Sequence, residues 1–168
     1  RFQKPKAGDF PAMLELFSRA REGLKLSEDA HLTPLPIDKA AASLSAILLD
    51  ESYYDFLKSM VREVGGIPVL GEAAIIPFKA RAWLDLTRQR EEGGNVDEKN
   101  IRKHRNDVAR LLQLLSQEAR YELPSSVADD MRSFVEQATA EADYDPRQFK
   151  VNMTRDDVAT RLRAAYQL

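Results

Sequence analysis

The sequence predicts an α+β fold, with a sheet region in residues 1–70 and a C-terminal helical domain, a bundle of about four helices, in residues 71–168. Short apolar runs in the first region are bounded by glycine, proline and charged residues, which is typical of strands joined by turns. From Gly71 onward the apolar residues recur at the three- and four-residue spacing of an α-helix. Capping residues and prolines stand where each predicted helix would begin or end.

The first predicted strand is the apolar run Phe10–Ser18, whose length and composition suit a buried strand. Residues 19–38 are polar and contain Pro34 and Pro36, so we expect a long connection there. Residues 43–49 fit either a strand or a short helix, because their leucine and alanine residues favour a helix and the periodicity does not decide.

A hairpin is predicted around Gly65-Gly66, because this dipeptide supplies the positive φ angles of a tight turn. Residues 53–64 and 67–70 would flank the turn. The three aromatic residues between positions 53 and 56 are of a type that stacks on nucleic-acid bases, but an aromatic cluster in a strand more often belongs to the core.

The first two predicted helices form a pair joined by a short loop. One runs from Glu72 to about Glu91, with Pro77 tolerated or kinking near its first turns, and stops at Gly93-Gly94-Asn95. Asp97 caps the second helix, which runs to about Glu118.

Two further helices complete the predicted bundle. Pro124 begins the third helix, which continues to about Ala142 and is broken by Asp145-Pro146. Thr154 caps the last helix, which has acidic residues in its first turn and ends near Tyr166.

The composition excludes several classes of site. The chain has 168 residues, no cysteine and a formal net charge of −2, so thiolate metal sites and thiol nucleophiles are excluded and no global charge draws the protein to nucleic acid. With two histidines in the sequence, a multi-histidine metal site within one chain is excluded too. No apolar run approaches the roughly 18 residues that span a bilayer, and we expect a cytoplasmic protein without a membrane partner. Glycine-rich phosphate loops, HExxH and nucleophile elbows are absent from the sequence.

Lys79 is the most informative polar residue. On a helix its neighbours three and four positions away are Ile75, Ile76, Ala82 and Trp83, all of them apolar. Either the lysine extends past these residues to water and covers Trp83 with its stem, or it lies partly desolvated beside an anion. The second interpretation makes it a cation directed at a phosphate or a carboxylate.

Asp107 is the second candidate. Lys103, His104 and Arg110 lie three or four positions away, so the plain interpretation is a surface ion pair worth well under about 1 kcal/mol. Asp107 also stands at the edge of the apolar stripe of its helix. If it faces Lys79 across the helix pair, the two form a charged couple in mostly apolar surroundings.

The basic run Arg102–Arg105, with Arg110 a turn further, is a candidate patch for phosphate contacts. Within it we select Lys103, His104 and Arg110 as candidate phosphate ligands together with Lys79. More often such a run is a solvated helix face, here offset by nearby acidic residues.

The segment IIPFKARAWLDLTRQREEGGNVDEKNIRKHRNDVARLLQLL, residues 75–115, resembles the C-terminal helical signature of AbiEii/AbiGii-type nucleotidyltransferase-like proteins. Many of these are toxins of bacterial toxin–antitoxin or phage-defence loci. The upstream segments FPAMLELFSR and SLSAILLDESYYDFL also resemble a subgroup of the family, so the resemblance covers nearly the whole chain.

The resemblance implies that residues 1–70 are part of a nucleotidyltransferase-type mixed sheet. It further implies that Lys79 contacts nucleotide phosphates, that Asp107 is the late acidic residue of the active site, and that Glu15 is a carboxylate near the metal. The expected reaction transfers a nucleoside monophosphate from a nucleoside triphosphate to an RNA (such as tRNA) or protein acceptor, with Mg²⁺ as cofactor. A cognate antitoxin is an expected partner. The alternative is a non-catalytic helical module that binds nucleic acid or a partner protein.

The sequence departs from the family at its early motif, a Gly-Ser turn followed by Asp-x-Asp on a strand. No glycine in the chain is followed by serine, and nucleotidyl transfer depends on metal-bound carboxylates. Because the motif is not matched, we expect either that it lies before Arg1 in a longer protein or that catalysis has been lost. The opening RFQKPK, which lacks a methionine, is the reason to expect a longer protein. The chain alone is not expected to catalyse transfer.

Overall fold

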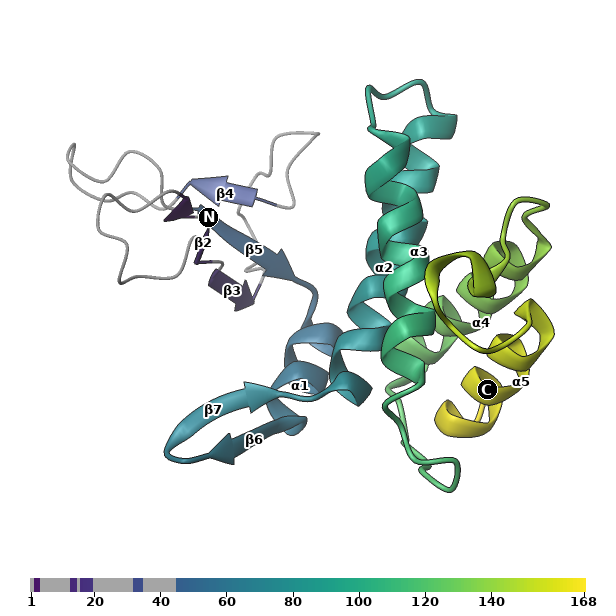
Figure 1. Cartoon of the computed structure of the whole chain (residues 1–168). Coiled ribbons are helices and arrows are strands. Elements are labelled where there is room, and N and C mark those ends of the chain that lie inside the picture. Colours follow the sequence, from purple (N-terminus) through teal and green to yellow (C-terminus); the bar gives the residue numbers. More distant parts are fainter. Residues whose placement is uncertain (1, 4–12, 15, 20–31, 35–44) are drawn as a thin grey trace. The chain divides into compact units, whose positions relative to one another are not determined.

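The computed structural model describes the backbone of residues 2–3, 13–14, 16–19, 32–34 and 45–168 (Figure 1). It describes side chains from Asp50 onward. The chain forms two compact units, Arg1–Asp55 and Phe56–Leu168. Strands and helices are both present and the C-terminal part is helical, so the α+β class is confirmed. Residues 56–70 group with the helices in the second unit, and the domain division at residue 70 stays a prediction.

The described residues of the first unit form short strands in two small sheets. One sheet pairs β1 with β2 in antiparallel fashion. In the other, β5 lies between β3, to which it is parallel, and β4, to which it is antiparallel, with Leu16 opposite Ala46 and Leu32 opposite Ile47. This sheet is therefore mixed. The bounds are Phe2–Gln3 for β1, Met13–Leu14 for β2, Leu16–Arg19 for β3, Leu32–Pro34 for β4 and Ser45–Leu49 for β5.

The connection predicted over residues 19–38 contains β4, which the prolines had argued against. Pro34 ends a strand at the edge of the described sheet, where the missing N–H of proline interrupts no ladder. The open choice for residues 43–49 is resolved as a strand, β5.

Helix α1, Glu51–Ser59, is where the prediction of extended structure from residue 53 was wrong. A local cap explains the helix: the backbone N–H of Tyr53 donates to the Asp50 carboxylate, Oδ1, at 3.0 Å, and this satisfies one of the free amides of a first turn. Tyr53 and Phe56, three residues apart, are 2% and 3% exposed. The aromatic residues thus follow a helical rather than an alternating pattern.

The hairpin around Gly65-Gly66 is confirmed. β6, Val61–Val64, pairs antiparallel with β7, Ile67–Leu70, and Val64 lies opposite Ile67. Gly65 and Gly66 have φ angles of 60° and 78°, a conformation that a two-residue hairpin turn requires and that residues with a Cβ rarely adopt.

The helical part consists of α2, α3, α4, a 3₁₀ turn η1 and α5, in chain order. The predicted start and end of α2 are both confirmed, and α4 and α5 agree with their predicted limits to within two residues. The bounds are Glu72–Glu91 for α2, Glu98–Leu112 for α3, Ser125–Ala140 for α4, Pro146–Phe149 for η1 and Arg155–Tyr166 for α5.

The predicted caps also form. The Asp97 side chain accepts from the Lys99 amide at 2.9 Å, and Thr154 forms a reciprocal capping box with Asp157. Helix α3 ends six residues before the predicted Glu118, because the chain tightens into i→i+3 turns from Leu111 onward.

The core of the second unit lies between α2, α3, α4 and α5. Trp83 on α2 meets Phe134 on α4 edge to face, with ring centroids 5.3 Å apart. Pro77 lies inside α2 and has no N–H to donate to the carbonyl of Ala73, four residues earlier. The buried hydroxyl of Tyr166 on α5 donates to that carbonyl at 2.9 Å, so the tertiary structure replaces the bond that the proline removes.

Within the described residues, no helix is long and apolar enough to cross a membrane.

Candidate functional site

Lys79 of α2 and Asp107 of α3 form an ion pair, with 3.3 Å between Nζ and Oδ2. Their side chains are 27% and 21% exposed, and Ile76 and Trp83 beside the lysine are fully buried. The predicted convergence of the two side chains between the first two long helices is confirmed. Lys79 therefore lies beside an anion and is partly buried, as the second interpretation expects.

Arg110 binds the same carboxylate from the other side. Its Nη1 lies 3.2 Å from Asp107 Oδ1, and its guanidinium stacks over the Phe149 ring of η1, 5.3 Å from the ring centroid. The two oxygens of Asp107 are thus each paired with a different cation. The three charges sum to +1, which favours an additional anion.

His104, one turn before Asp107, is neutral at pH 7. Burial, followed by repulsion from Lys79, lowers the pKa of His104 from 6.5 to about 4, while Asp107 acts in the opposite direction and Lys103 adds to the lowering. Its Nδ1 is buried and has no hydrogen-bond partner among the residues that the structure describes. A phosphate contact by His104 would be a hydrogen bond from a neutral imidazole, whereas the exposed Lys103 would contribute a full charge.

The described residues do not fit a magnesium site. Glu15 lies outside the described residues, and among those described no three histidine or acidic side chains gather as metal ligands would. The expectation that the chain lacks any Asp-x-Asp triplet was wrong, because Asp143–Asp145 is one. It lies between α4 and η1 and not on a strand as in the family motif. Hydrogen bonds from Arg105 and from Arg147 lower the pKa values of Asp143 and Asp145, respectively, so each carboxylate is paired with its own arginine.

Arg105, predicted in a basic patch, is instead buried, with 4% of its side chain exposed. It binds Glu141 and, at 2.9 Å, Asp143, and it stacks over Tyr144 with its Cζ 4.7 Å from the ring centroid. The run Arg102–Arg105 is therefore not one surface: Arg102 and Lys103 are exposed, and Arg105 faces inward. A polar cavity of about 240 Å³ adjoins it, lined by Arg90, Glu98, Ile101, Arg102, Arg105, Glu141 and Asp143.

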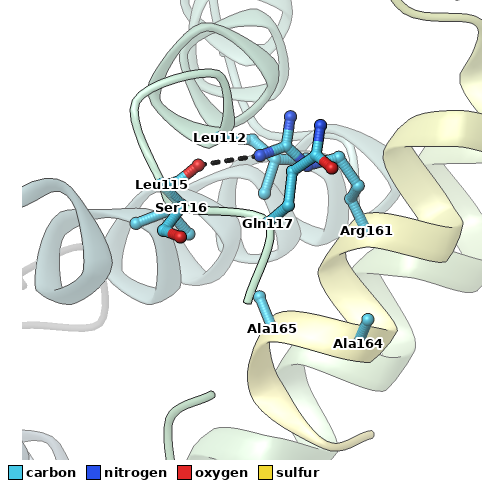
Figure 2. Close-up of a pocket in the computed structure, with 7 residues that line it drawn as sticks. All are labelled: Leu112, Leu115, Ser116, Gln117, Arg161, Ala164 and Ala165. Atoms are coloured by element: carbon cyan, nitrogen blue, oxygen red, sulfur yellow. Dashed lines mark hydrogen bonds between the residues drawn. The ribbon is translucent and has the colours of Figure 1, made fainter. Parts of the chain in front are cut away.

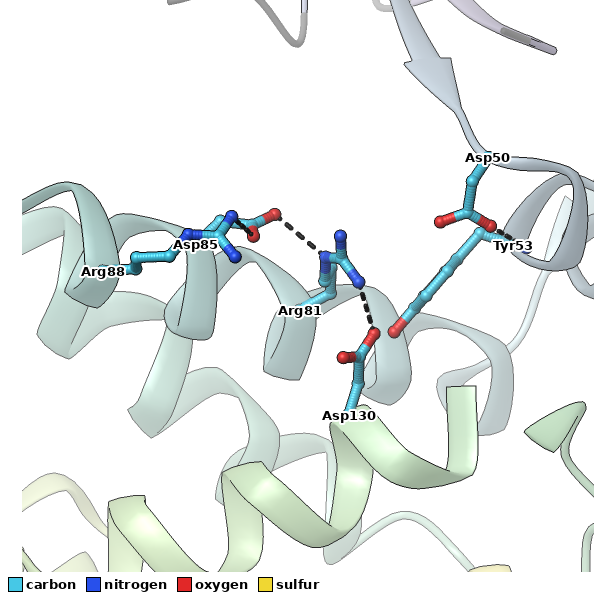
Figure 3. Close-up of polar contacts among 6 residues, drawn as sticks. All are labelled: Asp50, Tyr53, Arg81, Asp85, Arg88 and Asp130. Atoms are coloured by element: carbon cyan, nitrogen blue, oxygen red, sulfur yellow. Dashed lines mark hydrogen bonds and ion pairs between the residues drawn. The ribbon is translucent and has the colours of Figure 1, made fainter. Parts of the chain in front are cut away.

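A second ionic network, which the sequence analysis did not find, joins α2 to α4 (Figure 3). The carboxylate of Asp85, a residue 7% exposed, accepts from Arg81 at 3.1 Å and from Arg88 at 2.8 Å. Arg81 also contacts Asp130 on α4 at 2.6 Å. The spacing of three and four residues along α2 was a signal in the sequence, but the burial of Asp85 was not.

A second cavity, of about 280 Å³, lies between the end of α3 and α5 (Figure 2). Arg161 of α5 crosses it and donates from Nη2 to the Leu115 carbonyl at 2.8 Å, so this arginine closes the C-terminal end of the α3 segment. The other lining residues are Leu112, Ser116, Gln117, Ala164 and Ala165. Lys79 and Asp107 line neither of these two cavities, and the candidate site is the ion-paired cluster of Lys79, Asp107, Arg110 and His104.

No family model, no curated protein and no solved structure matches the chain. The assignment of the cluster therefore rests on its geometry and charge.

Proposed function

We propose that the chain is a nucleotidyltransferase-like protein of the AbiEii/AbiGii type, which binds the phosphates of a nucleoside triphosphate at Lys79. The proposed reaction passes the nucleoside monophosphate to an RNA or protein acceptor. The observation that supports this best is the ion pair between Lys79 and Asp107, 3.3 Å apart and contributed by two different helices.

Lys79 has the properties of a phosphate ligand. Its ammonium carries three donors and lies 3.3 Å from Asp107 Oδ2, and 27% of the side chain is exposed, so a ligand can reach it from solvent. Arg110 adds a second cation next to the same carboxylate. Asp107 orients the lysine, and His104 offers a neutral hydrogen-bonding group on the same helix.

The affinity of this cluster for a triphosphate should be low. One charge-assisted hydrogen bond contributes roughly 1.5–3 kcal/mol, and micromolar binding requires about 8 kcal/mol. The Mg²⁺ that the resemblance implies has no ligand set among the described residues, so the proposal for these residues concerns phosphate binding alone. We expect a dissociation constant in the millimolar range for the 168-residue chain and no transfer without further carboxylates.

A non-catalytic binding module is the second candidate. It is favoured by the lack of a metal ligand set in the described part of the chain and by the exposed apolar tip of the hairpin, where Val64 and Ile67 are 62% and 64% exposed. This module would bind nucleic acid or a partner protein and would not depend on Lys79.

Titration of the ¹⁵N-labelled chain with each of the four nucleoside triphosphates at low salt, with Mg²⁺ present, tests the proposal by NMR. We expect shifts centred on residues 76–83 and 103–110, and a roughly tenfold or greater loss of affinity in Lys79→Ala. Lys99→Ala is the matched control, because Lys99 is an exposed lysine of α3, and it should bind within about twofold of the wild type. Unchanged binding by Lys79→Ala, or shifts confined to the hairpin, would refute the proposal and support the second candidate.

Labelled-nucleotide transfer to total RNA and protein completes the test. The 168-residue chain should show none, and metal-independent transfer by this chain would contradict the assignment.

A further inference from the structure

The Asp107 carboxylate is shared by two cations that differ in how firmly they are held. Arg110 binds Oδ1 at 3.2 Å and also stacks on Phe149, whereas Lys79 contacts the carboxylate through Oδ2 alone, at 3.3 Å. A lysine carries its compact charge at the end of a flexible four-carbon stem. Of the two cations, Lys79 is therefore the one that can turn away while the carboxylate stays compensated.

Partial exposure makes this exchange possible. All three side chains are open to solvent, at 27%, 21% and 48% for Lys79, Asp107 and Arg110. Ion pairs in such positions are weak because water screens them, so a phosphate group that carries more charge than one carboxylate can compete for the ammonium.

We infer that Asp107 holds the Lys79 ammonium as an exchangeable counter-ion, which an incoming phosphate group displaces, and that Arg110 is a positioning residue that keeps Asp107 compensated during the exchange. This inference rests on the proposed function, since it describes how the phosphate ligand Lys79 is kept when no phosphate is bound. Asp107 thus lowers the affinity for phosphate although it belongs to the same site.

The sign of one substitution tests the first part. Inorganic tripolyphosphate is titrated without metal at low salt, with binding followed by NMR. Asp107→Asn should bind roughly two- to fivefold tighter than the wild type, because the competing charge is removed while the shape is kept. Asp129→Asn, which removes a carboxylate from an exposed ion pair with Arg132 on α4, controls for the change in net charge and should bind within about twofold of the wild type.

A double-mutant cycle tests the role of Arg110. In the wild-type background, Arg110→Ala should weaken tripolyphosphate binding more than Arg102→Ala, which removes an exposed arginine from the same helix. In the Asp107→Asn background the two arginine substitutions should have equal effects, because Arg110 then has no carboxylate through which to act. Circular dichroism checks that each variant is folded, and Asp107→Ser serves as a second variant with the same expected sign.

The outcomes separate the inference from the proposed function. Loss of binding in Lys79→Ala together with tighter binding in Asp107→Asn supports both. Loss in Lys79→Ala with equal or weaker binding in Asp107→Asn overturns the counter-ion role and leaves the phosphate site in place. Unchanged binding in Lys79→Ala overturns both, whatever Asp107→Asn does.

Discussion

Acidification from pH 7 to pH 5 should destabilise the helical unit through His104. Burial and the neighbouring Lys79 and Lys103 lower the pKa of this imidazole from 6.5 to about 4 in the folded protein, and Asp107 opposes them only in part. Between these two values the unfolded chain binds a proton that the folded chain does not. The contribution of the neutral His104 imidazole to the free energy of unfolding is therefore fully present above pH 6.5 and is lost as the pH falls toward 4.

The size of the effect follows from the two pKa values. For a fully enclosed imidazole with values of 6.5 and about 4, proton linkage predicts a loss of about 2 kcal/mol in the free energy of unfolding between pH 7 and pH 5. His104 is only half-buried, so screening by solvent reduces the expected loss to about 1 kcal/mol.

Urea unfolding at pH 7, 6 and 5 measures this loss. Trp83, the one tryptophan of the chain, is 1% exposed in the core of the helical unit, so its fluorescence reports unfolding of that unit. The difference between the wild type and His104→Gln isolates the imidazole from the carboxylates that also titrate. If both proteins lose the same stability between pH 7 and pH 5, the neutral, enclosed state of His104 is refuted.

Two further predictions concern the packing that supports the site. Tyr166→Phe should lower the free energy of unfolding by about 1–2 kcal/mol in the same urea assay, because a buried carbonyl of α2 loses its hydrogen-bond donor. In a Pro77→Ala background a backbone N–H is restored to that carbonyl, so the loss should be smaller. An equal loss in both backgrounds would contradict this role of Tyr166. Arg105→Ala should destabilise the unit by about 1–3 kcal/mol, since it empties a buried position and leaves two carboxylates without their cation. Arg102→Ala should change the stability by no more than about 0.5 kcal/mol, because the Arg102 side chain is exposed. Equal losses in the two variants would show that buried Arg105 does not stabilise the unit.

The sequence alone predicted only part of the candidate site. Helical spacing places Lys79 among apolar neighbours and Asp107 at the edge of an apolar stripe, because spacing defines which face of its own helix each residue occupies. Their meeting was a conditional expectation, and the packing of α2 against α3 decided it. The roles of the neighbouring residues Arg110 and His104 could not be predicted from the sequence. Arg110 is held on Asp107 and Phe149, and His104 is neutral, because both depend on what packs against α3 from elsewhere in the chain.

Helix α1 shows the limit of local propensity. Its aromatic residues are typical of strands, yet the Asp50 carboxylate caps a first turn and Tyr53 and Phe56 are buried on one helical face. The capping aspartate was visible in the sequence, but the burial that outweighed strand propensity was not.

By itself the sequence determined the features whose energy is local: the start and end of α2, the caps at Asp97 and Thr154, and the glycine turn at Gly65-Gly66. Each depends on hydrogen bonds or φ angles within a few residues, so it does not require contacts with distant parts of the chain. The tertiary structure alone decided that Arg105 turns inward, because its partners Glu141 and Asp143 lie 36 and 38 residues away. It likewise decided that Tyr166 completes α2 at Pro77, across 93 residues between the bonded groups. Burial of a polar group is favourable only when its partner arrives with it, and that partner is specified by the packing of distant segments.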